Sequence, residues 1–244
     1  MERDEVHLWL VDLDQPHDVR RELIGLLRDD ERARAARFAR PLLQDRFAVG
    51  RGVLRWVLAR YLGMDPAALS LTYGPYGKPL LMGAGDLRFN LSHSEGQALL
   101  GVARGVEIGV DIEAVRPLRD RDDVAQRTFT AGENRALAVL PPALRDAGFF
   151  ACWTRKEAVV KTTGIGFAFE LDWFEVPVGP LLGAPDRPVE LTVGGPPEVA
   201  GSYALWSPRA VESFAAAVAI RRADGTVSPA LRLHQRTFDA AAGS

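Results

Sequence analysis

The chain has 244 residues and a formal net charge of −2; 47% of its residues are hydrophobic and 25% are charged. This composition is typical of a soluble globular protein with one large domain or two small ones. The near-neutral charge excludes a general basic field for nucleic acid, and no apolar run is long enough to span a membrane. The single cysteine, Cys152, excludes an intrachain disulfide and fits a reducing compartment. We therefore expect a cytoplasmic protein that binds neither nucleic acid nor a membrane.

Apolar spacing and turn residues predict the elements of the first half of the chain. Pro41 favours the first turn of a long helix, and Gly63 can end that helix in a left-handed conformation. Arg104-Gly105 lies between two apolar runs and is typical of a hairpin turn. We expect helices at 29–40 and 42–62 and strands at 6–11, 69–73, 87–91, 99–103 and 106–112, of which the last two form the hairpin.

The second half repeats the mixture of helices and short strands. Pro141-Pro142 separates two short helical patterns from a long one that Gly164 can end. We expect helices at 122–127, 132–139 and 143–163, strands at 171–176, 188–193, 202–206 and 214–221, and fraying at 239–244. The change of half falls near residues 104–107. Helices beside small, mostly antiparallel sheets predict the fold class α+β.

Two acidic side chains share one face of the strand Gly109-Val110-Asp111-Ile112-Glu113. Side chains two residues apart on a strand point the same way, so Asp111 and Glu113 lie together while Val110 and Ile112 point to the core. Two such carboxylates repel each other unless a cation neutralises them, and Mg²⁺ prefers oxygen ligands. The alternative is the solvated outer face of an ordinary strand.

A stripe of three residues follows on the long helix. Trp153, Glu157 and Lys161 recur at four-residue spacing and therefore lie on one side. The stripe indicates either an ordinary surface ion pair or a functional set. In the functional set Glu157 is a third metal carboxylate or a base, and Lys161 is a cation for a phosphate or leaving group.

Lysine is scarce in this chain. Only Lys78, Lys156 and Lys161 are lysines among thirty Lys and Arg residues. Each therefore marks a candidate position that needs a compact ammonium group and not a planar guanidinium, although all three can also be leftovers of a compositional bias. Lys156 lies off the helix stripe, so we expect Lys156→Arg to be milder than Lys161→Arg.

The segment Arg88 to Gly96 carries the remaining polar signal. An apolar strand ends in Ser92-His93-Ser94, whose small donors suit phosphate oxygens, although a lone histidine is more often structural. The chain has no Walker loop and no zinc-ligand spacing, so side chains must supply any phosphate site. Arginines cluster in the N-terminal helices, where we expect most of them to form a solvated face: Arg32, Arg34, Arg37, Arg40, Arg46, Arg51 and Arg55.

Together these motifs resemble the 4′-phosphopantetheinyl transferases, in particular the Sfp-like branch that activates carrier proteins. The resemblance covers about residues 30–167 and rests on the order of four segments: Tyr76-Gly77-Lys78-Pro79, Phe89 to Ser94, Gly109 to Glu113, and Trp153 to Lys161. It implies two similar α+β halves in one chain, with coenzyme A in the cleft between them. The halves are expected at 1–105 and 106–225, the second with the metal site, and 226–244 is expected to be an extension.

The resemblance also implies roles for individual residues. Asp111, Glu113 and Glu157 are expected to bind Mg²⁺, with Mn²⁺ as an alternative ion, on the pyrophosphate of coenzyme A. Lys161 is expected to contact the same pyrophosphate. Further contacts with coenzyme A are expected from Lys78, Ser92, His93 and Arg34, the last near the 3′-phosphate, where family members commonly have lysine.

The implied reaction transfers the phosphopantetheine arm of coenzyme A to a serine of an apo acyl or peptidyl carrier protein. Adenosine 3′,5′-bisphosphate leaves, and Glu157 is the candidate base. The carrier is expected to meet residues 115–147 and those after the long helix, and the enzyme is expected to be a monomer. Two alternatives stay open: a metal-dependent phosphodiesterase or nuclease, and a carrier-binding module without activity.

Overall fold

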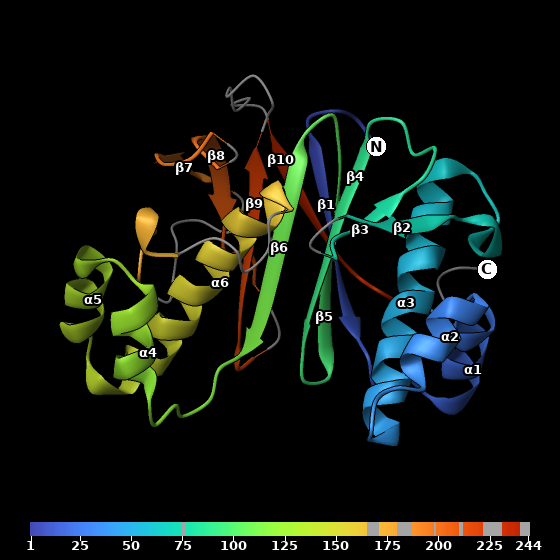
Figure 1. The fold of residues 1–244 in the computed structure, drawn as a ribbon, viewed down its shortest axis with the longest axis horizontal. Helices are drawn as coiled ribbons and strands as arrows, with labels where there is room; N and C mark the ends of the chain where they lie inside the picture. Colours follow the sequence, from blue (N-terminus) through green and yellow to red (C-terminus); the bar gives the residue numbers. More distant parts are fainter. Residues whose placement is uncertain are drawn as a thin grey trace.

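The protein is arranged in layers in the order helices, sheet, sheet, helices (Figure 1). The computed structural model describes residues 1–74, 77–164, 171–179, 187–197, 199–209, 212–221 and 231–239. The expected fold class, α+β with two small sheets, is confirmed. None of the described helices is long and apolar enough to cross a bilayer.

The first sheet has the strand order β10-β1-β5-β4. Its β1–β10 pair is parallel and its other pairs are antiparallel. Three helices cover its outer face, where Val53 and Val57 pack against Val11 and Leu100. The elements are β1 (Glu5–Asp12), α1 (His17–Gly25), α2 (Asp29–Ala35), α3 (Pro41–Leu62), the small pair β2 (Leu71–Tyr73) and β3 (Pro79–Leu81), β4 (Leu87–Ser94), β5 (Gln97–Arg104) and β10 (Arg232–Thr237).

The second sheet is antiparallel in the order β6-β9-β8-β7. Helix α6 lies on its outer face, with Val159 and Phe149 in the shared core, and α4 and α5 pack beyond α6. The elements are β6 (Glu107–Ala114), α4 (Arg121–Thr128), α5 (Ala131–Ala138), α6 (Arg145–Thr163), β7 (Val189–Val193), β8 (Gly201–Trp206) and β9 (Phe214–Arg221).

A core of apolar side chains fills the space between the two sheets. Val6 and Leu8 on β1 meet Val110 on β6 and Val218 on β9, all of them fully buried. Strand alternation explains this packing, because every second residue of β1 and β6 points inward. The other faces of the same strands remain available for helices and for polar groups.

The expected hairpin at residues 99–112 is wrong. β5 pairs with β1 and β4, whereas β6 pairs with β9 in the other sheet. Gly105 (φ 68°) lies where the chain leaves one sheet for the other. β4 and β6 instead lie side by side through side chains: Asn90 Oδ1 accepts a hydrogen bond of 2.8 Å from the Val110 amide.

Other elements differ from the sequence pattern in detail. Helix α1, strand β3 and strand β10 were not expected, α2 ends at Ala35, and a 3₁₀ turn at Leu171–Trp173 stands where a strand was predicted. The long helices agree with the prediction, since Gly63 (φ 64°) and Gly164 (φ 74°) end α3 and α6 in the left-handed region. Of the tail 239–244, only residue 239 is among the described residues.

Gly109 fixes the distance between β6 and α6. A Cβ atom at this position would lie 2.0 Å from the Ala158 carbonyl oxygen and 2.7 Å from the Thr162 amide nitrogen. Only glycine therefore allows the helix to pack this closely on the strand. The close approach places the Glu157–Lys161 turn of α6 beside Asp111.

Candidate active site

Asp111 is the centre of a buried polar cluster between the two halves. It is 3% exposed, and its Oδ1 accepts hydrogen bonds from Ser92 Oγ (2.7 Å) on β4 and from Lys161 Nζ (2.5 Å) on α6. Lys161 also donates to Ser92 Oγ at 3.0 Å. One strand from each sheet and the long helix thus converge on a single carboxylate.

Glu113 is held next to this group. Ser94 Oγ donates to Glu113 Oε2 at 2.7 Å, and the Ala114 amide donates to Ser94 Oγ at 3.2 Å. The pattern of β4 explains the pairing, because Ser92 and Ser94 share one face and meet Asp111 and Glu113, which share a face of β6. Burial raises the pKa of Glu113, and the Asp111 charge adds to that effect.

Glu157 completes the acidic set. Its carboxyl is 6% exposed, and burial raises its pKa to about 7. The Lys161 charge opposes this shift, whereas the charges of Asp111 and Glu113 reinforce it. The three carboxylates therefore repel one another, and the single positive charge of Lys161 does not neutralise all three.

The chemistry of this cluster fits a hard cation. Asp111 Oδ2 is buried and has no hydrogen-bond partner, which is costly for a carboxylate oxygen unless a ligand completes it. Carboxylate and hydroxyl oxygens are the donors that Mg²⁺ prefers. Among the described residues, the carboxylate oxygens of Asp111, Glu113 and Glu157 do not all lie within 4.8 Å of one another.

Arginines and His93 line a cavity on the first half of the molecule. The cavity has a volume of about 180 Å³, and Arg34, Arg46, Arg51, Phe47 and His93 contribute to its wall. A second cavity of about 200 Å³ shares Arg46, Phe47 and His93. The family resemblance predicted that Arg34 and His93 both contact coenzyme A, and the structure brings the two side chains to one cavity.

Arg51 is the most unusual of these arginines. It is 6% exposed, burial lowers its pKa, and its Nη1 atom has no hydrogen-bond partner. Its guanidinium carbon lies 5.5 Å from the ring centroids of both Phe47 and Tyr73, as does that of Arg34. A buried, incompletely satisfied guanidinium facing a cavity is suited to an anion such as phosphate.

His93 lines the arginine cavity and lies within reach of the charges of the acidic cluster. The residue is exposed, yet the atoms packed around it lower the pKa of its imidazole, and the Lys161 charge lowers it further. The charges of Arg51 and Asp111 also act on the ring, in opposite directions. Its side chain leaves β4 on the face opposite to Ser92 and Ser94, so it belongs to the wall of the arginine cavity and not to the hydrogen-bonded cluster around Asp111.

Lys78 lies at the boundary between the halves, but its ammonium group is bound to the C-terminal end of α6. Its Nζ donates to the carbonyl oxygens of Lys161 (2.7 Å) and Thr162 (3.2 Å) at the C-terminal end of α6. Carbonyls in the last turn of a helix have no helical partners, so the ammonium both satisfies them and complements the helix dipole. The contact of Lys78 with coenzyme A stays a prediction.

An apolar cavity of about 180 Å³ borders the acidic cluster on its other side. Glu113, Arg116, Phe150 and Trp153 line it, and the Trp153 ring stacks on Phe149 with centroids 6.0 Å apart. The stripe predicted on the long helix is therefore split, because Trp153 lines this apolar cavity while Glu157 and Lys161 belong to the polar cluster.

Comparison with known sequences identifies the family. A sequence profile described as the 4′-phosphopantetheinyl transferase superfamily matches residues 107–184. The 4′-phosphopantetheinyl transferase HetI of Nostoc sp. is 42% identical to this chain over 180 residues, which are 72% of this chain and 76% of the relative. This chain belongs to the 4′-phosphopantetheinyl transferase superfamily.

Other members of the superfamily show the same relationship. A 4′-phosphopantetheinyl transferase of Bacillus subtilis is 30% identical over 171 residues, which are 69% of this chain and 75% of the relative. The 4′-phosphopantetheinyl transferase AcpT of Escherichia coli (strain K12) is 35% identical over 120 residues, or 48% and 60% of the two chains. Asp111, Glu113, Glu157 and Lys161 lie inside the superfamily match, whereas His93 and the arginine cavity precede it.

Sequence reasoning missed part of the site. Arg46 and Arg51 were assigned to a solvated helix face, and Phe47 was not singled out. A signal was present, since Phe47 and Arg51 are four residues apart on α3, and the residues that follow Arg51 are apolar core. Ser94 was treated as a phosphate donor, whereas the structure gives its hydroxyl to Glu113.

Proposed function

We propose that this protein transfers the 4′-phosphopantetheine arm of coenzyme A to a serine of an apo acyl or peptidyl carrier protein. One observation carries the proposal: an arginine-lined cavity with His93 in its wall accompanies a cluster of three carboxylates, two of them buried, at the boundary of two halves in a chain of this superfamily. Coenzyme A carries phosphates that suit the arginines and a pyrophosphate that needs its charge neutralised before transfer.

The acidic cluster is proposed to hold the divalent cation. Asp111, Glu113 and Glu157 would bind Mg²⁺, or Mn²⁺ in its place, and the unpartnered Asp111 Oδ2 is the oxygen best suited to it. The cation supplies positive charge that neutralises the pyrophosphate oxygens. Ser92 and Ser94 orient Asp111 and Glu113 by their hydrogen bonds, so the serines position the carboxylates.

Glu157 is proposed as the base for the carrier serine. Burial raises the pKa of Glu157 to about 7 in the metal-free site, and a bound cation would lower it, which keeps the carboxylate ionised and able to accept a proton. Glu157 would accept the serine proton as the serine oxygen attacks the β-phosphorus of coenzyme A. The bond from that phosphorus to the bridging oxygen breaks, and adenosine 3′,5′-bisphosphate leaves with the bridging oxygen.

Cationic side chains are proposed to bind the substrate phosphates. Lys161 is 27% exposed and can turn from Asp111 to the pyrophosphate, where it would stabilise the charge that develops on the leaving group. Arg34 and Arg51 face the cavity suited to the 3′-phosphate, and His93 lines the same cavity. Lys78 and Ser92 complete the proposed contacts with coenzyme A.

We further propose a monomer with its site between residues 1–105 and 106–225. The apolar cavity at Trp153, the neighbouring helices α4 and α5 and the residues after α6 form the proposed carrier surface, because Glu113 of the acidic cluster also lines that cavity. The reducing compartment expected from the single cysteine is the cytoplasm.

Mass spectrometry of an apo carrier protein tests the function directly. Incubation with coenzyme A, Mg²⁺ and the purified chain is expected to add one phosphopantetheine arm to the carrier. Parallel incubations omit the carrier or omit the divalent ion and add a chelator. Cleavage of coenzyme A without a carrier would favour a phosphodiesterase, and an unmodified carrier with intact coenzyme A would favour a binding module.

A further inference from the structure

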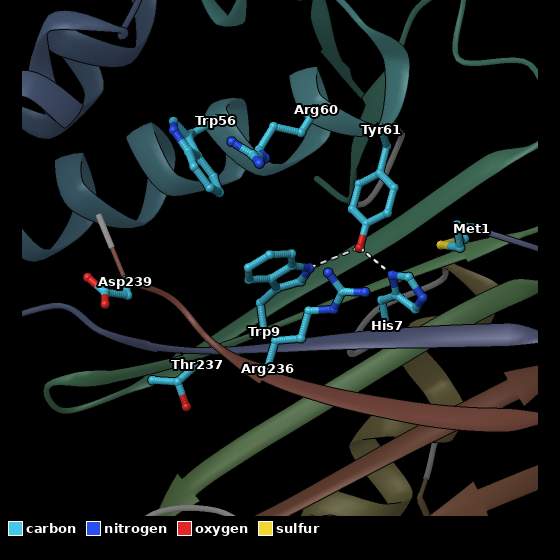
Figure 2. A pocket seen from close by; sticks show the side chains of 9 residues that line it. All are labelled: Met1, His7, Trp9, Trp56, Arg60, Tyr61, Arg236, Thr237 and Asp239. Atoms are coloured by element: carbon cyan, nitrogen blue, oxygen red, sulfur yellow. Dashed lines mark hydrogen bonds between the residues drawn. The ribbon is translucent and has the colours of Figure 1, made fainter. Parts of the chain in front are cut away.

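Another cavity, of about 400 Å³, lies between β1, β10 and the C-terminal end of α3. Figure 2 shows Trp9, Trp56 and Tyr61 around this space, with the guanidinium groups of Arg60 and Arg236 directed into it. His7 forms part of the wall. None of these residues belongs to the proposed active site.

β1 and β10 bring three side chains that can bind a metal to one face beside this cavity. Glu5 and His7 are two residues apart on β1 and therefore share a face. β10 runs parallel to β1, and His234 lies directly opposite His7. Val6 and Leu8 point to the core between the sheets, so the face with the three polar groups is turned toward α3.

The distances suit one shared ion. His7 Nε2 lies 3.3 Å from Glu5 Oε2, and His234 Nε2 lies 3.8 Å from Glu5 Oε1. One donor atom from each residue lies within 4.8 Å of the other two, and no other group of three His, Cys, Asp or Glu among the described residues does so. Tetrahedral Zn²⁺ with bonds of about 2.0–2.2 Å holds its ligand atoms roughly 3.3–3.6 Å apart.

The second ring nitrogen of His7 has the partner that a metal-bound histidine requires. His7 Nδ1 lies 2.6 Å from Tyr61 Oη, which also accepts a hydrogen bond of 3.1 Å from Trp9 Nε1 (Figure 2). When Nε2 binds a metal, Nδ1 carries the proton and donates it to Tyr61 Oη. Such an outer hydrogen bond fixes the tautomer and the orientation of the ring.

We propose that Glu5, His7 and His234 bind a divalent transition metal of the zinc class. Two imidazoles and one carboxylate with a fourth position left to water suit Zn²⁺, whereas Mg²⁺ prefers oxygen ligands alone. His234 is exposed, so the ion can enter from solvent. The site shares no residue with the Asp111 cluster and does not depend on the proposed transferase function.

Zinc binding to the untagged full-length chain tests the site. Chelator-treated protein is dialysed against Zn²⁺, and bound metal is counted for the wild type, His234→Ala and the control His17→Ala. His17 is exposed at the start of α1 and lies outside the cluster. We expect His234→Ala to lose one equivalent of bound Zn²⁺ and the tetrahedral visible spectrum of bound Co²⁺, and we expect His17→Ala to keep both.

Two further variants test the surroundings of the ion. Tyr61→Phe removes the outer hydrogen bond and is expected to weaken Zn²⁺ binding about 10- to 100-fold without changing the number of sites. Arg236→Gln is expected to strengthen binding, because it removes a positive charge that acts on His7 while leaving all three ligands.

Equal Zn²⁺ stoichiometry and equal Co²⁺ spectra for the wild type and His234→Ala would overturn the proposal. Loss of zinc in His17→Ala would overturn it as well, since the metal would then bind elsewhere. Transferase activity of His234→Ala is measured in the same preparation, and we expect it to equal that of the wild type. An inactive wild type that still binds this zinc would therefore reject the transferase function alone.

Discussion

Two lysines on α6, Lys156 and Lys161, lie in opposite kinds of polar environment. Lys156 and its partner Glu133 are almost fully buried and form an ion pair of 2.8 Å. Lys156 Nζ also donates to the carbonyl oxygens of Leu171 (2.7 Å) and Phe174 (2.5 Å), and Glu133 also accepts from the amides of Thr130 and Val176. One positive charge meets one negative charge, and every donor and acceptor of the pair has a partner.

Lys161, five residues later, faces three carboxylates and is partly open to solvent. One oxygen of Asp111 has no partner, and burial raises the pKa values of both Glu113 and Glu157. The two clusters therefore have different roles. The Lys156–Glu133 cluster, with equal charges and every hydrogen bond made, holds the structure together, whereas the Asp111 cluster, with excess negative charge and an unpartnered oxygen, is stabilised further only by a ligand. The predictions below change one environment at a time.

Lys156→Met is expected to have the largest effect, on stability. It leaves the Glu133 charge buried without its partner, and breaking such a pair costs about 3–5 kcal/mol. Urea unfolding of the purified variant measures the loss. Arg121→Ala is the control, since it removes ion pairs with Asp122 and Asp146 at a more exposed place and is expected to cost about 1 kcal/mol or less.

Lys156→Arg, expected to be milder than Lys161→Arg in its effect on activity, is expected from this environment to reduce stability. A guanidinium is larger than an ammonium, and Lys156 is fully enclosed by Glu133, two carbonyls and the Phe174 ring. Overpacking of this kind costs about 1–3 kcal/mol. A Lys156→Arg variant as stable as the wild type would show that the surrounding groups adjust to the larger guanidinium, and it would weaken the contrast between Lys156 and Lys161.

Glu157→Gln is expected to have the largest effect on activity while leaving the fold intact. Removal of one electrostatic element of a catalytic site costs about 10²–10³ in rate, or roughly 3–4 kcal/mol. The amide keeps the shape of the side chain, and at pH 8 without Mg²⁺ we expect the variant to be more stable than the wild type. Wild-type turnover at saturating Mg²⁺ would remove Glu157 from the mechanism.

The contribution of Glu157 to the stability of the metal-free protein is expected to fall as pH rises from 5 to 8, in the opposite direction to that of His7, whose pKa burial lowers to about 4. The pKa of Glu157 is about 7 in the folded state and 4.5 as its ordinary value, so between these values the folded state binds a proton that the unfolded state has released. Stability is therefore lost toward high pH, by up to about 3 kcal/mol. Thermal unfolding of the wild type and Glu157→Gln across this range measures it, and equal pH slopes would contradict the shift.

Lys161→Arg is expected to have a smaller effect on activity than Glu157→Gln, about tenfold in rate or ~1.4 kcal/mol. The charge remains, but a planar guanidinium cannot occupy the compact position between Ser92 and Asp111. Steady-state kinetics with coenzyme A and an apo carrier measure the change. A fully active variant would show that this lysine is a charge without a geometric requirement.

Local rules predicted the helices that begin and end at clear signals. Pro41, Gly63 and Gly164 mark the bounds of α3 and the end of α6 in the sequence and in the structure. The sequence could not predict which strands pair. Residues on either side of Gly105 have the pattern of a hairpin, but β5 and β6 belong to different sheets and both place side chains in the core between them.

For the site, residue spacing within one strand or helix predicted which side chains lie together, whereas the sequence did not show which side chains from different elements meet. The period of a strand placed Asp111 and Glu113 together, and the superfamily resemblance joined them to Glu157. The pairing of Ser92 with Asp111 and of Ser94 with Glu113 depends on β4 lying beside β6, which no local pattern encodes. The interior position of Arg51 likewise depends on which side of α3 faces the first sheet.

Strand β10 has a consequence for how the chain folds during synthesis. It completes the sheet that β1 begins, pairing Arg232 with Glu5 across almost the whole length of the chain. Contacts between such distant residues close a very large loop and form late. Until β10 emerges from the ribosome, one edge of β1 stays unpaired and open to other strands. The two sheets are therefore not two successive folding units, and the protein reaches its native state only after its last strand has been made.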